Sequence, residues 1–535
     1  MSLSSPFPAS ASGRLSAFFL MSLAMVGGAS AATLSVGPGK TYAAPCAAFA
    51  RAQTGDVIQI DGGKTYSGDV CAIGASNLTI RGVNGRPVID AAGKNAQGKG
   101  TWVIQGNSVT VDNVEMAGAS VPDRNGAALR IEGTNFTLRS SYLRNNENGI
   151  LTGANDNSSI VIENTEFASN GRGDGYSHNV YIGHVGSLTF RYNYSHDANG
   201  GHNLKSRASV NTINYNRFSS STGKPSYEID LPNAGTSYVI GNVIHQPASH
   251  NNPGLLAYGN EGASNPKQDL YVVNNTFLND DSVRGTFVLV GGSVTTPVLL
   301  QNNIFGGTGA ATNQTNAIDR TNFRSLVPGF INRLLFDLHP IANVLVINAG
   351  SVPGVSAAGV SLTPVAQYKH TASGETRAAA SVRDIGAYAA LNSGSTPAPS
   401  AWTTCAAENA TCGFSGTREV RYGAGNSWVV KVFTNNVQCS NAVFGDPIEG
   451  TVKTCSYAAT TSTAPTPAPT TPVTWTACAA ENGTCAFTGT RDVRYGVPGA
   501  YATKAFTTRT ACTNAVFGDP IEGTVKSCSY SSQAR

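Results

Sequence analysis

The chain has 535 residues, a formal net charge of +4, and only 13% charged residues, with 59 glycines and 10 cysteines. So mild a charge over this length excludes a protein that depends on a strongly basic surface, and we expect no nucleic-acid partner. No stretch approaches the about 20 consecutive apolar residues of a membrane span, so no membrane segment is expected either.

The first residues have the pattern of an export signal. Arg14 precedes an apolar run over 15–28, and Ala29, Ser30 and Ala31 form a small-residue cleavage pattern. Such a pattern is typical of a secretory signal peptide, here 1–31, which is removed from the mature protein. We therefore predict a secreted, extracellular protein, and we expect it to act as a monomer.

Residues 32–391 are predicted to form one all-β domain. A short helix is expected over 42–53 and a strand over 56–60, and the helix would cover the open edge of the first coil. Short strands then recur every roughly 24 to 27 residues, a period typical of stacked solenoids. A β-propeller would need about 40 residues per blade and hairpin turns, which this stretch lacks. Asn-rich turns end the second strand of each repeat, at 192–194, 215–218, 241–244, 274–277 and 302–305. We expect Asn there because it tolerates the left-handed conformation and can bond its neighbour in the next coil.

Four segments of this domain align, at 178–183, 202–207, 227–232 and 254–259. Their period-two alternation predicts strands whose aliphatic residues are stacked inside, namely Val180, Leu204, Ile229 and Leu256. Two columns are then predicted to face outward, Asn179, Asn203 and Glu228 in one and Tyr181, Lys205 and Asp230 in the other. Parallel coils lie about 4.8 Å apart, which would place Lys205 beside Asp230.

Ionisable side chains concentrate in this stretch. Six of the eight histidines lie in it, at 178, 184, 196, 202, 245 and 250. Surface ion pairs contribute only about 0–1 kcal/mol each, so stability alone gives little reason for the cluster. We therefore predict a functional site, with candidate catalytic residues Lys205, Arg207, Glu228, Asp230, His178 and His202 and candidate substrate-binding residues Asn179, Tyr181, Asn203 and Tyr258.

Both ends of the domain resemble a known superfamily. Residues 50–58 and 62–66 resemble the first coil of the right-handed parallel β-helix proteins of the pectate-lyase-like superfamily, and 337–340, 347–350 and 383–388 resemble the C-terminal cap of its secreted members. The resemblance implies a right-handed parallel β-helix. It says little about chemistry, because one fold hosts many functions.

A narrower resemblance concerns one residue. Lys205-Ser206, Asn211, Asn216-Arg217-Phe218, Ser221 and Gly223 look like the pattern of the chondroitinase B and alginate lyase group, which implies a Lys base at position 205. That group expects an Arg on the next coil as the acid, where this sequence has Tyr227-Glu228-Ile229-Asp230. Only Lys205 carries over.

These residue types support two reactions and one binding role. In β-elimination on a uronate, Lys205 would abstract a proton while Arg207 holds the carboxylate. In glycoside hydrolysis, Glu228 and Asp230 would act as paired carboxylates. Alternatively, the columns would grip a polysaccharide without turnover, as in an adhesin. A Ca²⁺ site built from Asp174, Asp197 or the histidines is also left open, although no diagnostic spacing marks one.

Beyond the helix domain the composition changes. Ser, Thr, Pro and Ala dominate 392–400 and 458–473, which are predicted to be extended linkers. They separate two copies of one module, 401–457 and 474–535, which resemble the β-rich modules appended to secreted glycan-degrading enzymes and imply carbohydrate binding. Candidate sugar-stacking aromatics, each with a core role as the alternative, are Trp402, Tyr422, Trp428 and Phe444, and Trp475, Tyr495, Tyr501 and Phe517.

The cysteines fit an oxidising destination. Cys46 and Cys71 stand near the start, and each module holds four cysteines with identical spacing: Cys405, Cys412, Cys439 and Cys455, then Cys478, Cys485, Cys512 and Cys528. These spacings lack the CxxC clusters of a zinc site, so disulfides are predicted. Three connectivities within each module stay open.

Overall fold

The computed structural model describes residues 31–221, 224–333, 335–341, 345–391, 402–424, 427–444, 450–458, 474–497, 500–519, 521 and 523–534. Residues 1–30 of the predicted signal peptide, the linker 392–400 and residues 459–473 of the second linker lie outside these ranges. The chain divides into two compact units, 1–397 and 398–535. Within the described ranges, no helix is both long and apolar enough to cross a membrane.

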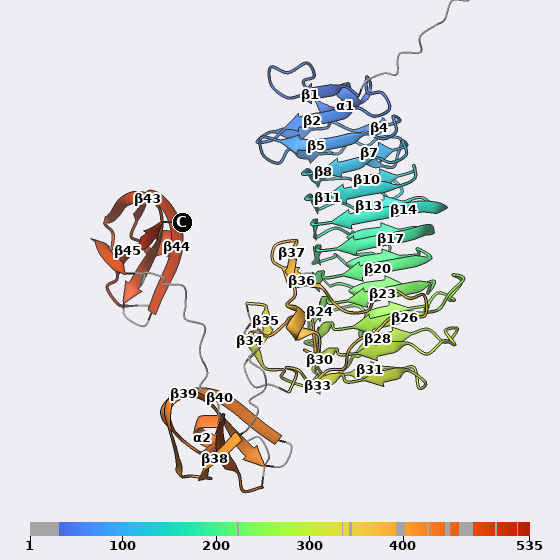
Figure 1. The fold of residues 1–535 in the computed structure, drawn as a ribbon. Coiled ribbons are helices and arrows are strands. Elements are labelled where there is room, and N and C mark those ends of the chain that lie inside the picture. The colour runs from blue at the N-terminus through green and yellow to red at the C-terminus, as the bar shows by residue number, and fades with distance from the viewer. Residues whose placement is uncertain are drawn as a thin grey trace, which may run out of the picture. The chain divides into compact units, whose positions relative to one another are not determined.

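The first unit is a solenoid of three parallel sheets, and it confirms the predicted right-handed parallel β-helix (Figure 1). Sheet A contains β1 (Thr33–Val36), β2 (Val57–Asp61), β5 (Thr79–Val83), β8 (Thr110–Asp112), β11 (Phe136–Arg139), β14 (Asn155–Glu163), β17 (Val185–Arg191), β20 (Val210–Asn214), β23 (Thr236–Ile240), β26 (Leu270–Val273), β29 (Leu299–Gln301) and β32 (Ile318–Arg320). Sheet B contains β3 (Thr65–Ser67), β6 (Val88–Asp90), β9 (Glu115–Ala117), β12 (Tyr142–Arg144), β15 (Glu166–Ala168), β18 (Tyr194–His196), β21 (Arg217–Ser219), β24 (Val243–Gln246), β27 (Thr276–Asn279), β30 (Ile304–Gly307) and β33 (Phe323–Ser325). Sheet C contains β4 (Cys71–Ile73), β7 (Gly100–Ile104), β10 (Ala127–Ile131), β13 (Asn148–Thr152), β16 (Val180–Ile182), β19 (Leu204–Ser206), β22 (Ile229–Leu231), β25 (Gly254–Tyr258), β28 (Thr286–Val290) and β31 (Ala310–Thr312).

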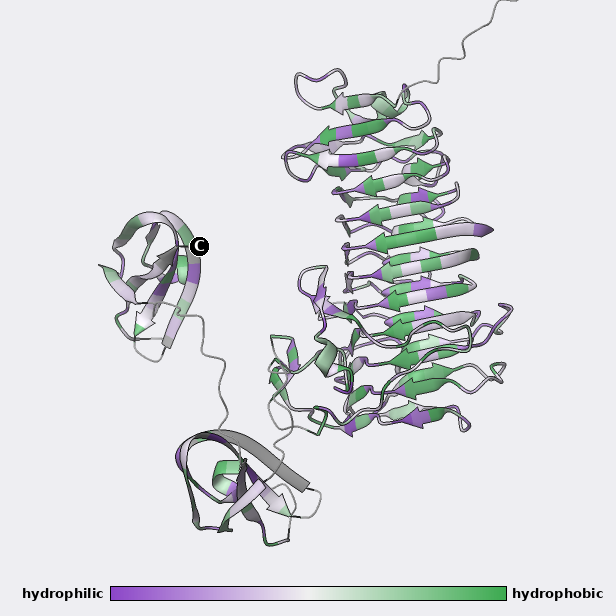
Figure 2. Ribbon diagram, viewed as in Figure 1, coloured by the Kyte–Doolittle hydropathy of each residue, from purple (hydrophilic) through white to green (hydrophobic). Residues whose placement is uncertain are grey.

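One continuous apolar core runs through the solenoid, and apolar segments recur coil after coil (Figure 2). The predicted inward residues Val180, Leu204, Ile229 and Leu256 are fully buried, and the last three stand in register on neighbouring strands. Alternation within each strand therefore positions the core as the sequence predicts.

The first coil is closed by α1 (Pro45–Phe49), which is shorter than the predicted helix. Phe49 packs edge-to-face on Trp102 with ring centroids 5.1 Å apart, and Cys46 is bonded to Cys71 of β4. The helix thus covers apolar side chains that would otherwise be open at this end.

A buried ladder of asparagines links the coils at the corner between sheets A and B. Each side-chain amide donates to the Oδ1 of the next, in the order Asn193, Asn216, Asn242, Asn275, Asn303 and Asn322. The prediction that Asn bonds its neighbour in the next coil is confirmed. The left-handed conformation belongs to the residue before each ladder asparagine. That residue is itself an asparagine at Asn274 (φ 53°) and Asn302 (φ 56°), as predicted, and a tyrosine at Tyr192 (φ 58°) and Tyr215 (φ 58°).

The sequence resemblance implied that the segment after β33 caps the last coil, but in the structure it does not. It contains β34 (Phe330–Asn332), β35 (Asp337–Pro340), β36 (Ala366–Lys369), β37 (Ser373–Thr376) and a 3₁₀ turn at Ala379–Ser381, and it lies along the side of the solenoid beside β24 (Figure 1). Along this side, Asn164 donates to the carbonyl of Ala372, and Gly386 donates to that of Asn302. We call residues 330–391 the strap.

Each C-terminal module is a four-stranded antiparallel sheet with a short helix. The first contains β38 (Trp402–Ala407), β39 (Thr411–Ala424), β40 (Ser427–Gln438), α2 (Asn441–Phe444) and β41 (Thr454–Ala458). The second contains β42 (Trp475–Ala480), β43 (Thr484–Val497), β44 (Ala500–Ala511), α3 (Asn514–Phe517) and β45 (Ser527–Ala534).

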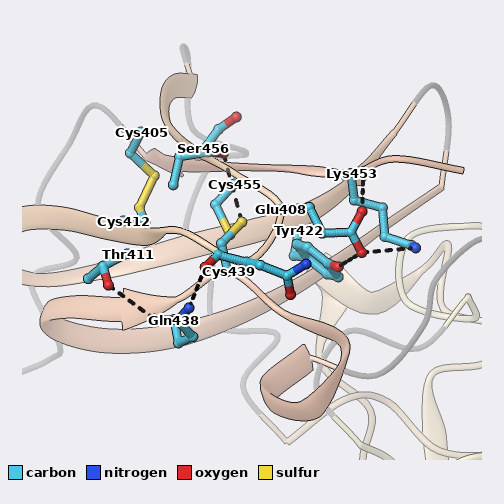
Figure 3. The surroundings of a disulfide bond; sticks show 12 residues. Cys405, Glu408, Thr411, Cys412, Tyr422, Gln438, Cys439, Lys453, Cys455 and Ser456 are labelled. Atoms are coloured by element: carbon cyan, nitrogen blue, oxygen red, sulfur yellow. Dashed lines mark hydrogen bonds and ion pairs between the residues drawn. A yellow bond between two sulfur atoms is a disulfide. The ribbon is translucent and has the colours of Figure 1, made fainter.

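Two disulfides per module are confirmed, and their connectivity is settled. Cysteines pair first with second and third with fourth, as Cys405–Cys412 and Cys439–Cys455 in the first module and Cys478–Cys485 and Cys512–Cys528 in the second. Beside them, the buried Tyr422 hydroxyl lies 2.7 Å from a Glu408 oxygen (Figure 3). A domain this small depends on disulfides for stability, since its hydrophobic core is small.

The ladder gives a prediction about stability. Asn242→Ala should lower the free energy of unfolding by about 1–3 kcal/mol, because the Asn216 amide loses its buried acceptor. Thermal denaturation would measure the loss. The matched control is the exposed Asn157→Ala, which should melt like the parent. Equal melting of the two variants would contradict a stabilising ladder.

Candidate active site

A cleft of about 760 Å³ lies over β16, β19 and β22 of sheet C. It gathers six of the predicted site residues, His178, Tyr181, His202, Lys205, Arg207 and Asp230. Tyr181, Lys205 and Asp230 are consecutive members of one outward column. Their predicted orientation is therefore confirmed.

Four charged side chains form a connected network in the cleft. The Lys205 ammonium lies 3.2 Å from Asp230 Oδ2 and 2.7 Å from Glu261 Oε1. The other Glu261 oxygen lies 2.5 Å from Arg207 Nη2. One carboxylate therefore bridges the two cations.

Further contacts fix the Arg207 guanidinium. Its Nε donates to the Tyr181 hydroxyl at 3.0 Å, and its Nη1 donates to Asn233 Oδ1 at 2.6 Å. Both Arg207 and Lys205 also lie within 6 Å of the Tyr181 ring centroid, at 5.8 and 5.7 Å. A cation near an aromatic ring at that distance is attracted to it.

A column of stacked rings lines one side of the cleft. The His178 and His202 rings lie 4.7 Å apart at 9°, and the Tyr227 ring stacks on His202 at 5.2 Å. The His202 backbone amide donates to His178 Nδ1, and the Tyr227 backbone amide donates to His202 Nδ1. In the neutral rings, Nε2 therefore carries the proton.

Electrostatics keep both imidazoles neutral. Burial, with Lys205 and Arg207 nearby, lowers the pKa of His178 to about 3. Burial, with His178 and Lys205 nearby, also holds the pKa of His202 well below its usual value. The rings therefore act as hydrogen-bond donors and stacking surfaces rather than as cations.

The two carboxyls of the network differ in acidity. Burial raises the pKa of Asp230 to about 6, although the Lys205 ammonium opposes the shift. Burial acts in the same direction on Glu261, but hydrogen bonds from Lys205 and Arg207 hold the pKa of that carboxyl below its usual value. Asp230 is thus the carboxyl that can exchange a proton near neutral pH.

The predicted outward orientation of Asn179, Asn203 and Glu228 is wrong. These residues are fully buried and belong to a second ladder, in which amides donate in the order Asn146, Asn170, Asn179, Asn203 and end on Glu228 Oε2. Strand alternation fails here because Asn179, Asn203 and Glu228 precede β16, β19 and β22, at the corner between sheets B and C.

The ladder changes the interpretation of Glu228. Its carboxyl does not line the cleft, and its Oε1 is buried without a partner among the described residues. Burial raises the pKa of Glu228 to about 8, with the Asn203 hydrogen bond opposing the shift. A neutral carboxylic acid therefore ends the ladder at pH 7.

Tyr258 also lies inside the solenoid rather than at the substrate face. It alternates with Ala257 on β25, is fully buried, and donates its hydroxyl to the Gly235 carbonyl at 2.7 Å. The prediction that Tyr258 contacts the substrate is therefore wrong, because its side chain does not reach the cleft.

Sequence reasoning missed Glu261, Asn233 and Tyr227. Glu261 follows β25 in a loop between Gly259 and Gly262, which have φ values of 73° and 108°. An acid flanked by glycines directly after an aligned strand was the available signal. Tyr227 directly precedes the Glu228–Asp230 segment, and Asn233 follows it by three residues.

The other four histidines of the 178–250 stretch lie away from the cleft. His196 contacts Asp197 and Glu166, His245 contacts Asp280, His250 contacts Asp281, and His184 is exposed. Across the described ranges, no group of three or more His, Cys, Asp or Glu side chains is arranged to hold a metal ion. Asp174, Asp197 and the histidines named for a Ca²⁺ site therefore form no such group among the described residues.

No protein-family model matches the sequence. Among solved structures, the chain is similar to pectate lyase Pel9A, with a TM-score of 0.47 and 15% identity over 68% of this chain and 98% of that one. It is also similar to the pectin methylesterase from Aspergillus niger (TM-score 0.29, 11% identity, 57% of this chain and 93% of that one). A third similar structure is pectin methylesterase PemA from Erwinia chrysanthemi (0.28, 13%, 54% and 92%).

Glu228 gives a prediction about pH. Because its folded-state pKa is raised to about 8 from 4.5, its contribution to stability is complete below about pH 4.5 and is lost as pH rises through 8. Glu228→Gln should remove this loss, at about 1.4 kcal/mol per pKa unit, and melt above the parent at pH 9. Thermal denaturation at pH 5, 7 and 9 measures it.

The matched control is Glu163→Gln, an acid on sheet A that contacts Arg191 at 2.8 Å. It should leave the pH dependence of stability as in the parent. If Glu228→Gln behaves like this control, Glu228 is ionised in the folded protein and the neutral end of the ladder is wrong.

Proposed function

We propose that the protein is a secreted polysaccharide lyase that cleaves a uronate-containing glycan by β-elimination. The observation that carries the proposal is the pairing of Lys205 and Arg207 in one cleft, bridged by a carboxylate at 2.7 and 2.5 Å. A site that binds one carboxylate between two cations has the chemistry to bind a uronate. Arg207 then neutralises the charge that develops on the carboxylate when the neighbouring proton is removed.

The reaction needs a base, a carboxylate clamp and an acid. Arg207 holds the substrate carboxylate, and neutral Lys205 takes the proton from the carbon beside it. A carbon–carbon double bond forms as the glycosidic carbon–oxygen bond breaks. Tyr181 gives its proton to the leaving oxygen, because its hydroxyl already accepts from Arg207 Nε and has its own hydrogen to donate.

Lys205 must first lose its resting proton. In the structure it is an ammonium in contact with two carboxylates. Asp230 is the nearest buried acceptor, 3.2 Å away, and its pKa of about 6 lies above that of an ordinary Asp. The pair therefore forms a short path for moving the proton within the cleft.

Glycoside hydrolysis is the second candidate function, in a form different from the one predicted. Glu228 does not reach the cleft, but Asp230 and Glu261 both contact Lys205 and their pKa values are pushed apart. Carboxyls with separated pKa values are the usual mark of an acid and a base. Asp230 would serve as acid and Glu261 as base.

We propose that the C-terminal modules bind glycan. Of their candidate aromatics, Tyr422, Phe444, Tyr495 and Phe517 are core residues, which supports the alternative for these four. The Trp428 side chain lies outside the described residues. In the second module, Arg494 lies 4.6 Å from the Trp475 ring and 4.3 Å from the Tyr501 ring, which is 36% exposed. In the first, Arg421 lies 4.8 Å from Trp402.

The setting follows from these assignments. We propose that the protein is exported and acts outside the cell as a monomer, with a polysaccharide as its partner. Two modules joined by a linker would raise the effective concentration of the enzyme on a polymer.

The lyase proposal predicts the products and one variant. Incubation with neutral and acidic polysaccharides should give near-ultraviolet absorbance from an unsaturated uronate on an acidic one. Lys205→Ala should lower kcat/KM at least about 10²-fold, as is typical when a general base is lost. The exposed Lys267→Ala serves as the matched control and should retain parental activity.

Other outcomes decide between the alternatives. New reducing ends without absorbance would indicate a hydrolase, and binding without either signal would indicate an adhesin. Parental activity in Lys205→Ala would place the reactive centre elsewhere.

The modules give a separate prediction. Residues 401–535 should be retained on a polysaccharide that the whole protein binds, and Trp475→Ala should weaken this retention because it removes the ring beside Arg494. Affinity electrophoresis in gels containing the polysaccharide measures it. Tyr495→Phe, which changes only a buried hydroxyl, is the control. Unretained modules would be spacers.

A further inference from the structure

Glu261 differs from its partners in the cleft by its exposure. Its side chain is 46% exposed, whereas those of Lys205 and Arg207 are 10% and 18% exposed. The two cations also keep other contacts, to Asp230, Tyr181 and Asn233. Glu261 is therefore the one member of the network that can move into solvent while the others remain bonded.

The loop that carries Glu261 has backbone geometry suited to such a movement. Gly259 and Gly262 both have positive φ, and a side chain at Gly262 would meet nothing within 4 Å. The Glu261 amide donates to Pro232, which anchors the backbone and leaves the side chain to swing. Glu261 can then leave the cations without unfolding sheet C.

The charges in contact give a reason for it to leave. Lys205 and Arg207 carry two positive charges, and ionised Asp230 and Glu261 carry two negative ones, so the network is neutral. A substrate carboxylate entering between the cations would add an unbalanced negative charge beside Glu261. Like charges this close repel, whereas withdrawal of Glu261 restores the balance.

We propose that Glu261 is an internal stand-in for the substrate carboxylate, which a uronate displaces when it binds. This inference rests on the proposed uronate-binding function of the cleft. A uronate carboxylate takes the two contacts that Glu261 now makes, one to Lys205 and one to Arg207. A neutral sugar offers no competing anion and leaves Glu261 in place. Glu261 therefore makes the cleft selective for sugars that carry a carboxylate.

Displacement also changes which carboxylates contact Lys205. With Glu261 withdrawn, the ammonium keeps Asp230 as its remaining carboxylate from the protein, and Asp230 can accept its proton. Glu261 is a positioning and specificity residue, because it acts through Lys205 and Arg207 rather than on the reacting bond.

Equilibrium binding tests the proposal without turnover. Titration of the full-length protein with D-glucuronate, followed by calorimetry or NMR, should show at least about tenfold tighter binding to Glu261→Gln than to the parent, because a competing charged hydrogen bond is gone. Binding of D-glucose should be equal in the two proteins. Glu261→Ala should behave like Glu261→Gln, with melting temperature as the check on folding.

Asp174→Asn is the matched control, since Asp174 lines the same cleft but accepts its hydrogen bonds from the Tyr176 amide and the Ser177 hydroxyl. An equal gain of affinity in this variant would show that overall charge, rather than displacement, governs binding, and would overturn the proposal. Unchanged or weaker glucuronate binding to Glu261→Gln would also overturn it. A fall in kcat of about 10²-fold with no gain of affinity would make Glu261 the hydrolytic base instead.

The two proposals fail separately. If Glu261→Gln binds glucuronate more tightly but no polysaccharide yields an unsaturated product, displacement stands and the lyase assignment is wrong. If unsaturated product forms but Glu261→Gln gains no affinity, the lyase assignment stands and displacement is wrong.

Discussion

Two buried ladders of side-chain amides hold the coils of this solenoid in register. At each corner the chain turns from one sheet to the next and exposes backbone groups that no strand can satisfy. The asparagines at the sheet A–B corner accept from the backbone amide and the side chain of the coil before, as Asn242 does from Asn216. Because unsatisfied buried polar groups are costly, these contacts fix how each coil sits on its neighbour. The register of sheet C, and so the meeting of Lys205 with Asp230, depends on this fixed stacking.

The cleft shows what that regular spacing does to charge. Side chains on adjacent strands are held within contact distance, so oppositely charged residues pair and imidazoles stack. The protein then controls protonation by burial: His178 and His202 stay neutral beside two cations, while Asp230 retains a proton more readily than an exposed Asp. Such a site offers both fixed charges and groups able to exchange protons, within a few ångströms of one another.

The sequence predicted the fold well because repetition amplifies weak signals. The period of the coils, the inward aliphatic residues and the asparagines of the first ladder all follow from short local patterns. It also predicted the outward column of Tyr181, Lys205 and Asp230. Alternation misplaced Asn179, Asn203 and Glu228, because it applies within a strand and these residues stand at a corner where the chain changes direction. Glu261 was missed because its contacts come from a loop, whose path no periodic pattern describes.

The strap has a consequence for how the solenoid unfolds. A stack in which each coil touches only its neighbours behaves as a one-dimensional chain, so it can fray from an end, one coil at a time. Residues 330–391 bond instead to several coils at once, from Asn164 through Tyr215 and Asn274 to Asn302. The last coils cannot detach while the strap remains bound to the earlier ones. The strap therefore links the coils of the second half of the solenoid, so that they unfold as one cooperative unit. This unit is complete only after the strap, which follows these coils in the sequence, has been synthesised.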